Sequence, residues 1–192
     1  MTFEEAYAYT SHVGSMGSYT KEQLRALWEG MEATNPAFGH MDLIEIGCEY
    51  GRSTSLIMQW LCDKAQSDYS LYLIDPFTTG HDVMERCMRN LSHIPVPFVL
   101  CKCSSADADW MINKLTTGNR KFLHIDGDHE PDGLKADCRL YVSELRPGDV
   151  VAFHDYGCPG LPHIKPIVDT YTKGWEVVAH RECCYVVRKP YG

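Results

Sequence analysis

Acidic, hydroxyl and imidazole side chains gather shortly after five apolar segments of this sequence. The polar runs are residues 47–54, 75–77, 104–107, 126–129 and 154–156, and the apolar segments before them end at residues 46, 74, 100, 125 and 153. A carboxylate can hold a cation or a pair of hydroxyls, and a histidine, whose ordinary pKa is about 6.5, can take a proton near neutral pH. These residue types therefore predict a site that binds a polar ligand and moves a proton.

The residues after the first apolar segment predict a tight turn that approaches a ligand closely. Gly47 and Gly51 permit such a turn because glycine tolerates backbone angles that other residues avoid. A nucleotide-pyrophosphate site would need Gly-x-Gly-x-x-Gly, but Glu49 takes the middle position and Glu45 adds a second acid. Carboxylates repel a pyrophosphate and suit a cationic ligand, such as one that carries an ammonium and a sulfonium. Asp75, at the end of the second segment, is placed to accept hydrogen bonds from a ribose diol.

Apolar segments of strand length alternate with helical patterns from residue 42 onward. The strand-like segments are 43–46, 71–74, 97–100, 122–125 and 150–153, and the helical patterns cover 53–64, 81–91, 106–115, 134–145 and 164–171. This alternation is typical of βαβ units in a parallel sheet, where ligands bind beyond the carboxyl ends of the strands. The short gap between 175–179 and 184–187 predicts a hairpin, so we expect the sheet to end with an antiparallel strand.

A further helix is predicted ahead of this alternation. Thr20 and Gln23 have capping-box spacing, and Leu24, Leu27 and Trp28 follow at helical spacing. We therefore expect an α/β fold with a single-domain, Rossmann-like doubly wound sheet, mostly parallel with a C-terminal antiparallel hairpin strand, plus N-terminal helices. In this prediction residues 1–40 form an N-terminal helical cover and residues 41–192 form the main domain.

The composition excludes several classes of protein. The 192 residues include 18 Lys and Arg against 26 Asp and Glu, which gives a formal net charge of −8. Hydrophobic residues make up 44% and charged residues 23%, values close to those of globular proteins, so we exclude disordered and fibrous classes. The acidic balance argues against a broad nucleic-acid-binding surface. No apolar run approaches the roughly 18 residues that a membrane span requires, so no membrane partner is expected.

The nine cysteines predict a compartment rather than a disulfide framework. Their number is odd, and the first residues lack a basic, apolar signal segment. We therefore expect reduced thiols and a cytoplasmic location.

The residues singled out above resemble the class I S-adenosylmethionine-dependent methyltransferases. Glu45, Gly47 and Gly51 resemble their first motif, Asp75 resembles the acid that holds the cofactor ribose, and residues 104–107 fall where the family contacts adenine. The resemblance implies S-adenosylmethionine as the cofactor. The cofactor-binding residues that it implies are Glu45, Gly47, Gly51, Ser53, Thr54, Asp75, Ser104, Ser105, Asp107 and Asp126.

Residues 122–129 and 145–155 are similar to one branch of that family, the small O-methyltransferases that include catechol-type and macrolide-sugar enzymes. The resemblance implies a divalent cation, Mg, Mn or Fe, held by Asp126, His154 and Asp155. An acid is usual at the position of His154, and an imidazole there favours manganese or iron over magnesium. His129 stands where some sugar enzymes of the branch have a catalytic histidine, so the implied catalytic residues are His129, Asp126 and Asp155.

The expected function is O-methylation of a small hydroxylated acceptor, either sugar-containing or phenolic, with His129 as general base. Two alternatives stay open. A cofactor-binding module of the same fold without turnover fits the short chain and the departure at His154. A nicotinamide-dependent oxidoreductase is disfavoured because the middle glycine of its motif is missing. The expected partner is a small molecule, and the sequence leaves the formation of a homo-oligomer open.

Overall fold

The computed structural model describes residues 1–11, 13, 19–34, 39–64, 68–111 and 118–192. Seven strands form one sheet in the order β3-β2-β1-β4-β5-β7-β6. The first five strands pair in parallel, whereas β7 runs antiparallel to both β5 and β6. The strands are β1 (Met41–Ile46), β2 (Tyr69–Ile74), β3 (Val99–Cys101), β4 (Arg120–Ile125), β5 (Val150–Phe153), β6 (Glu176–Arg181) and β7 (Cys184–Arg188).

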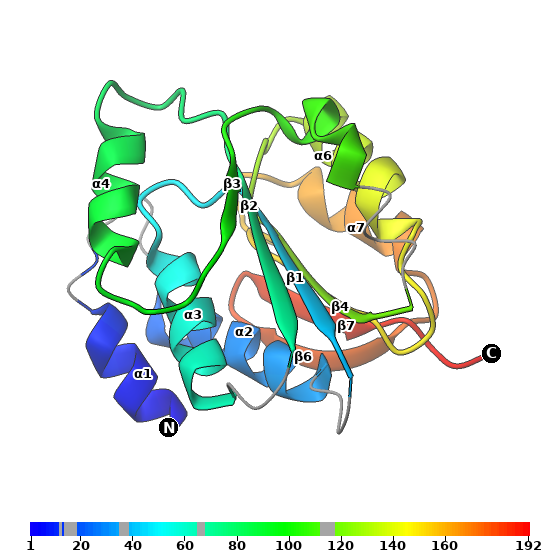
Figure 1. Ribbon diagram of the computed structural model, residues 1–192. Coiled ribbons are helices and arrows are strands. Elements are labelled where there is room, and N and C mark those ends of the chain that lie inside the picture. Colours follow the sequence, from blue (N-terminus) through cyan, green and yellow to red (C-terminus); the bar gives the residue numbers. More distant parts are fainter. Residues whose placement is uncertain (12, 14–18, 35–38, 65–67, 112–117) are drawn as a thin grey trace.

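Helices cover both faces of the sheet, which gives three layers (Figure 1). One face carries α1 (Phe3–Thr10), α2 (Lys21–Thr34), α3 (Arg52–Lys64) and α4 (Val83–Leu91). The other face carries α6 (Pro131–Asp137), which continues into a π-helical turn (Cys138–Val142), and α7 (Ile164–Tyr171). Among the described residues, no helix is both long and apolar enough to cross a bilayer.

Strand alternation divides the buried side chains between two cores. In β1, Leu43 packs in the core beneath α1 to α4, whereas Ile44 and Ile46 pack in the core beneath α6 and α7. All six residues of β1 are buried, as expected of a central strand covered by helices on both faces. The core beneath α1 to α4 contains α2 residues together with residues of β1, β4 and β7. Apolar packing is therefore continuous across residue 40, and the predicted division into 1–40 and 41–192 stays a prediction.

Most predicted elements are confirmed, including the α/β class and the antiparallel C-terminal pair. The capping box of α2 is present, because the Thr20 hydroxyl accepts from the Gln23 amide and the Gln23 side chain accepts from the Thr20 amide. The helix predicted over 106–115 is wrong in its described part, where two short 3₁₀ turns cover Ser105–Asp107 and Asp109–Met111. Residues 112–117 lie outside the described residues. None of the nine cysteines, all of which are described, forms a disulfide.

Candidate functional site

A cavity of about 880 Å³ lies at the carboxyl ends of the parallel strands. Most of the predicted site residues line it, because the carboxyl ends of parallel strands share one edge of the sheet. The predicted residues that line the cavity are Gly47, Ser53, Asp75, Ser104, Ser105, Asp126, His129, His154 and Asp155. Four predicted cofactor-binding residues are not among the lining residues, namely Glu45, Gly51, Thr54 and Asp107.

Gly47 brings the turn after β1 against the end of β4. Its φ is +84°, and a β-carbon at this position would lie 2.0 Å from the carbonyl oxygen of Asp126. Its amide donates to the Ile74 carbonyl at 2.9 Å, and the Asp126 amide donates to the Ile46 carbonyl at 2.8 Å. Only glycine fits here, since any side chain would meet the backbone of the neighbouring strand end.

Asp75 holds this turn in place. Its Oδ2 accepts from the backbone amides of Cys48 at 2.9 Å and Glu49 at 2.8 Å, and its Oδ1 accepts from the amide of Phe77 at 2.6 Å. A carboxylate offers about four lone-pair positions, so three of them are used and one on Oδ1 remains for a ligand hydroxyl. The carboxylate thus stabilises the turn and is also a candidate acceptor for a hydrogen bond from a ribose hydroxyl.

Glu49 in the turn and Arg52 at the start of α3 are the charged residues at this part of the cavity. Burial raises the pKa of Glu49, and the neighbouring charges of Asp126 and Asp75 raise it further. A cationic ligand would relieve that repulsion. Arg52, the first residue of α3, also lines the cavity, and its buried Nε has no hydrogen-bond partner among the described residues. An unpartnered guanidinium nitrogen at the start of a helix suits a carboxylate.

Ser104 and Ser105 form one wall of the cavity, and hydrogen bonds of Ser105 with α6 and its π-helical extension stabilise this wall. The Ser105 hydroxyl donates to Asp137 Oδ1, and the Tyr141 hydroxyl donates to the Ser105 carbonyl at 2.7 Å. Ser104 instead donates to Asp107 Oδ2 at 2.6 Å, which keeps the exposed Asp107 within its own turn. The two serines therefore reach the cavity, whereas Asp107 supports the turn.

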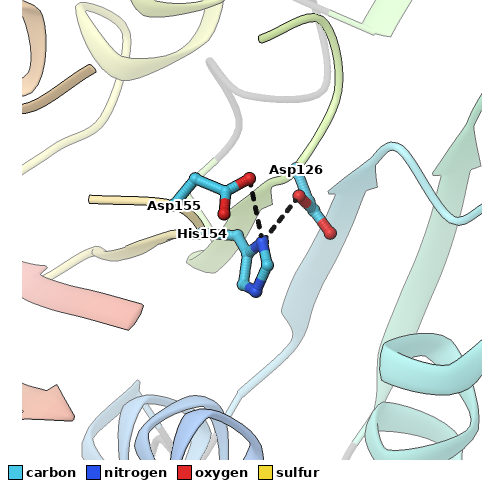
Figure 2. A group of neighbouring side chains, drawn as sticks. All are labelled: Asp126, His154 and Asp155. Carbon is cyan, nitrogen blue, oxygen red and sulfur yellow. Dashed lines mark ion pairs between the residues drawn. The ribbon is translucent and has the colours of Figure 1, made fainter. Parts of the chain in front are cut away.

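Asp126, His129, His154 and Asp155 converge at the ends of β4 and β5. The Nδ1 atom of His154 lies 3.0 Å from Asp126 Oδ1 and 3.2 Å from Asp155 Oδ2, as the dashed lines of Figure 2 show. The Nε2 atom of His129 lies 3.3 Å and 3.2 Å from the same two oxygens. Two imidazoles therefore share two carboxylate oxygens. Asp155 has a left-handed φ of +58°, and such strained residues cluster at functional sites.

Contacts within the cluster shift the pKa values of Asp126, His129 and His154. Burial by itself would raise the pKa of Asp126, but contacts with His129 and His154 hold it well below its usual range. Burial would lower the pKa of His154, but Asp126 and Asp155 raise it to about 10. The hydrogen bond with Asp126 raises the pKa of His129, which is about half exposed. Asp126 and His154 therefore form a largely buried ion pair, and His129 is the most accessible member of the cluster.

Three members of the cluster also fit a divalent cation. One ligand atom from each of Asp126, His154 and Asp155 lies within 4.8 Å of the others. Both ring nitrogens of His154 are buried without a hydrogen-bond partner among the described residues, so neither of the short contacts of Nδ1 has hydrogen-bond geometry. Nδ1 of His154 and one oxygen from each of Asp126 and Asp155 thus form a candidate ligand set for a cation. The mixed donor set suits manganese or iron better than magnesium.

Glu45 lies away from the cavity, in the core beneath α1 to α4. Its side chain is fully buried, 3.0 Å from Nδ1 of His124, and it accepts a hydrogen bond from the Thr54 hydroxyl. Strand alternation explains this placement, since Ile44 and Ile46 face the opposite core.

Sequence reasoning missed Tyr19, His124 and Arg52. The Tyr19 hydroxyl lies 3.1 Å from Nε2 of His124 and donates to Asp126 Oδ2 at 2.5 Å. Nothing in the local pattern around Tyr19 signals this contact. The one available signal for His124 was a titratable residue inside an apolar strand.

A family model described as a methyltransferase domain matches residues 44–156 of this sequence. The chain belongs to this family of methyltransferase domains. The match covers the glycine turn, Asp75 and the whole cluster at the ends of β4 and β5. It confirms the resemblance to the class I S-adenosylmethionine-dependent methyltransferases. A search of curated proteins found no match.

Solved structures share the fold of this methyltransferase domain. CalS11, a TDP-rhamnose 3'-O-methyltransferase of calicheamicin biosynthesis, aligns with a TM-score of 0.67 and 14% identity over 86% of this chain and 77% of its own. The O-methyltransferase NovP aligns with a TM-score of 0.61 and 17% identity, over 88% of this chain and 78% of its own. An O-methyltransferase from Bacillus cereus, solved with S-adenosylhomocysteine, aligns with a TM-score of 0.58 and 12% identity. The alignment covers 97% of this chain and 90% of that enzyme. At these identities the likeness establishes the fold.

Proposed function

We propose that this methyltransferase domain transfers a methyl group from S-adenosylmethionine to a hydroxyl of a small acceptor, either sugar-containing or phenolic, with His129 as general base. The observation that carries the proposal is the position of His129 Nε2, within 3.3 Å of both Asp126 Oδ1 and Asp155 Oδ2, at the wall of the cavity that Gly47 and Asp75 also line. The names of CalS11, NovP and the Bacillus cereus enzyme support an oxygen acceptor.

The cavity offers a complementary group for each part of the proposed cofactor. The free lone pair of Asp75 suits a ribose hydroxyl, and the wall of Ser104 and Ser105 suits the adenine. Glu49, whose pKa is raised by burial and by nearby carboxylates, suits the ammonium or the sulfonium. Arg52 suits the carboxylate of the methionine moiety because its Nε is buried and unpartnered among the described residues.

The reaction is an in-line displacement. The acceptor oxygen forms a bond with the methyl carbon while the carbon–sulfur bond breaks, and S-adenosylhomocysteine leaves as a neutral thioether. The acceptor hydroxyl must lose its proton at or before this attack. Because carboxylates only accept, Nε2 of neutral His129 carries the ring proton and donates it toward Asp126 and Asp155. Nδ1 therefore takes the proton of the acceptor, and the two carboxylates stabilise the imidazolium that forms.

A divalent cation in this site would be held by Asp126, His154 and Asp155. When bound, it supplies Lewis-acid polarisation and orientation of the acceptor hydroxyl. His129 lies outside this set of three and keeps its role as the group that removes the proton.

The test measures single-turnover methyl transfer from radiolabelled S-adenosylmethionine to a panel of acceptors that includes catechol, free rhamnose and TDP-rhamnose. We expect His129→Ala to lower the rate by about 10²–10⁴-fold, the usual contribution of positioned acid–base catalysis, without changing the affinity for S-adenosylhomocysteine. His180→Ala, at an exposed histidine of β6, is the matched control. A His129→Ala variant with the wild-type rate would show that another group is the base. Failure of the wild-type protein to bind S-adenosylhomocysteine would refute the cofactor assignment.

A further inference from the structure

A buried chain of side chains leads from the sheet to Asp126. Glu45 and His124 are fully buried and directly paired in the register of β1 and β4, with Glu45 Oε1 3.0 Å from His124 Nδ1. The Tyr19 hydroxyl, whose residue is 5% exposed, lies 3.1 Å from His124 Nε2 and donates to Asp126 Oδ2 at 2.5 Å. The chain connects residues more than a hundred positions apart to the carboxylate at the centre of the proposed site.

The single proton of a tyrosine hydroxyl fixes the direction of both hydrogen bonds of Tyr19. A tyrosine hydroxyl has one proton, and Tyr19 gives it to the carboxylate of Asp126. The remaining contact of Tyr19 must then be accepted, so Nε2 of His124 is the donor. Glu45 faces the other ring nitrogen and fixes the orientation of the imidazole, as carboxylates do for histidines in oriented sites.

The two oxygens of Asp126 have separate partners. Oδ2 receives the Tyr19 hydroxyl, whereas Oδ1 faces His129 Nε2 at 3.3 Å and His154 Nδ1 at 3.0 Å. A carboxylate held at one oxygen cannot rotate without losing that bond. The contact with Tyr19 therefore fixes the plane of the Asp126 carboxylate, so that the other oxygen faces the two histidines.

We propose that Tyr19, supported by His124 and Glu45, is a positioning residue that holds the Asp126 carboxylate in the orientation the proposed methyl transfer needs. The inference deepens the proposed function, and its effect on the reaction rate rests on that function. The effect of Tyr19 on the orientation of the Asp126 carboxylate does not depend on the proposed function.

The surroundings of Tyr19 make it a rigid support. Thr20, the next residue, caps α2 and donates from its hydroxyl to Glu182 at 2.5 Å, in the turn between β6 and β7. Arg181 forms ion pairs with Glu22 and Glu29 of α2, at 2.7 Å and 2.8 Å. The Tyr19 ring also packs against the His154 ring, with centroids 4.3 Å apart. The start of α2 is thus fixed to the sheet on the same side as the cluster.

Core filling is the competing explanation, and it makes a different prediction. A phenylalanine at residue 19 keeps the ring, the packing on His154 and the apolar contacts, and removes only the hydroxyl. If Tyr19 served only to fill space, Tyr19→Phe would leave both the orientation of Asp126 and the reaction rate unchanged. A positioning role requires both to change.

The experiment compares Tyr19→Phe with Tyr156→Phe. Tyr156 is also buried and donates its hydroxyl to a carboxylate, that of Asp169 at 2.7 Å, which does not line the cavity. Crystal structures of both variants with S-adenosylhomocysteine report the Asp126 carboxylate directly. We expect it to be rotated or in two conformations in Tyr19→Phe and unchanged in Tyr156→Phe. An Asp126 carboxylate that keeps its place in Tyr19→Phe overturns the proposal.

Kinetics supplies the second measurement. We expect Tyr19→Phe to lower single-turnover methyl transfer by about 10- to 100-fold, the usual effect of losing a group that orients a site ligand, with unchanged affinity for S-adenosylhomocysteine. The double variant Tyr19→Phe, His124→Gln should lose little more than the single one, because both changes break the same chain. A Tyr19→Phe rate equal to that of Tyr156→Phe overturns the kinetic part. If His129→Ala retains full activity, the proposed base fails, but the crystal structures still decide the role of Tyr19.

Discussion

Asp137 offers a test of the electrostatics behind the cavity wall. It is the last residue of α6 and is 1% exposed. The Ser105 hydroxyl donates to its Oδ1, while its buried Oδ2 has no hydrogen-bond partner among the described residues. Burial raises the pKa of this carboxyl from its ordinary value of 3.8 to about 6, against the opposing effect of the Ser105 hydrogen bond. The folded protein therefore holds the proton of Asp137 more tightly than the unfolded chain does.

The sign and size of the effect follow from this difference. Between about pH 4 and pH 6 the folded state binds more protons than the unfolded state, so this group makes stability fall as the pH rises. The shift from 3.8 to about 6 corresponds to about 3 kcal/mol at 1.36 kcal/mol per pKa unit. Above about pH 6, where Asp137 is ionised, its buried carboxylate lowers the free energy of unfolding by this full amount.

Asp137→Asn removes this cost and keeps an oxygen that can accept from Ser105. We expect the variant to match the wild type near pH 4 and to exceed its free energy of unfolding by about 3 kcal/mol at pH 8. Urea denaturation at pH 4, 5, 6, 7 and 8 measures the difference. Asp132→Asn is the control, because the Asp132 side chain lies on the same helix and is 99% exposed. A stability difference between Asp137→Asn and the wild type that is the same at every pH would refute the reasoning.

Three further outcomes test the cofactor side of the cavity. Gly47→Ala should lower the free energy of unfolding, measured by urea denaturation, by about 3 kcal/mol or more, because the new β-carbon would lie 2.0 Å from the Asp126 carbonyl oxygen. A variant as stable as the wild type would contradict this close backbone contact. Asp75→Ala should weaken binding of S-adenosylhomocysteine in calorimetry by about 10- to 100-fold, the range of hydrogen bonds to charged groups, and an unchanged affinity would contradict the assignment. Arg52→Met should lower the affinity for S-adenosylhomocysteine by about tenfold or more. The affinity for 5′-methylthioadenosine, which lacks the carboxylate, should not change. Equal losses for both ligands would place Arg52 elsewhere.

The sequence by itself determined the architecture and the edge of the sheet at which the chemistry lies. Alternating strand and helix patterns fix a parallel sheet, and polar residues at the carboxyl ends of its strands must meet at one edge. For this reason Asp126 and Asp155, far apart along the chain, were expected together, and the structure places both within reach of His129. Gly47 was likewise readable, because a glycine after a strand is typical of a close backbone approach.

Tertiary structure decided which face each side chain takes and which partners it meets. Glu45 matches a cofactor motif in the sequence, but the alternation of β1 turns its side chain into the core beside His124. Asp75 was readable as a ribose acceptor, yet its hydrogen bonds to the amides of the turn depend on where that turn folds. Tyr19 lies in a segment with no periodicity. It reaches Asp126 only because α2 is fixed to the far end of the sheet, and such long-range contacts arise from packing rather than from local sequence.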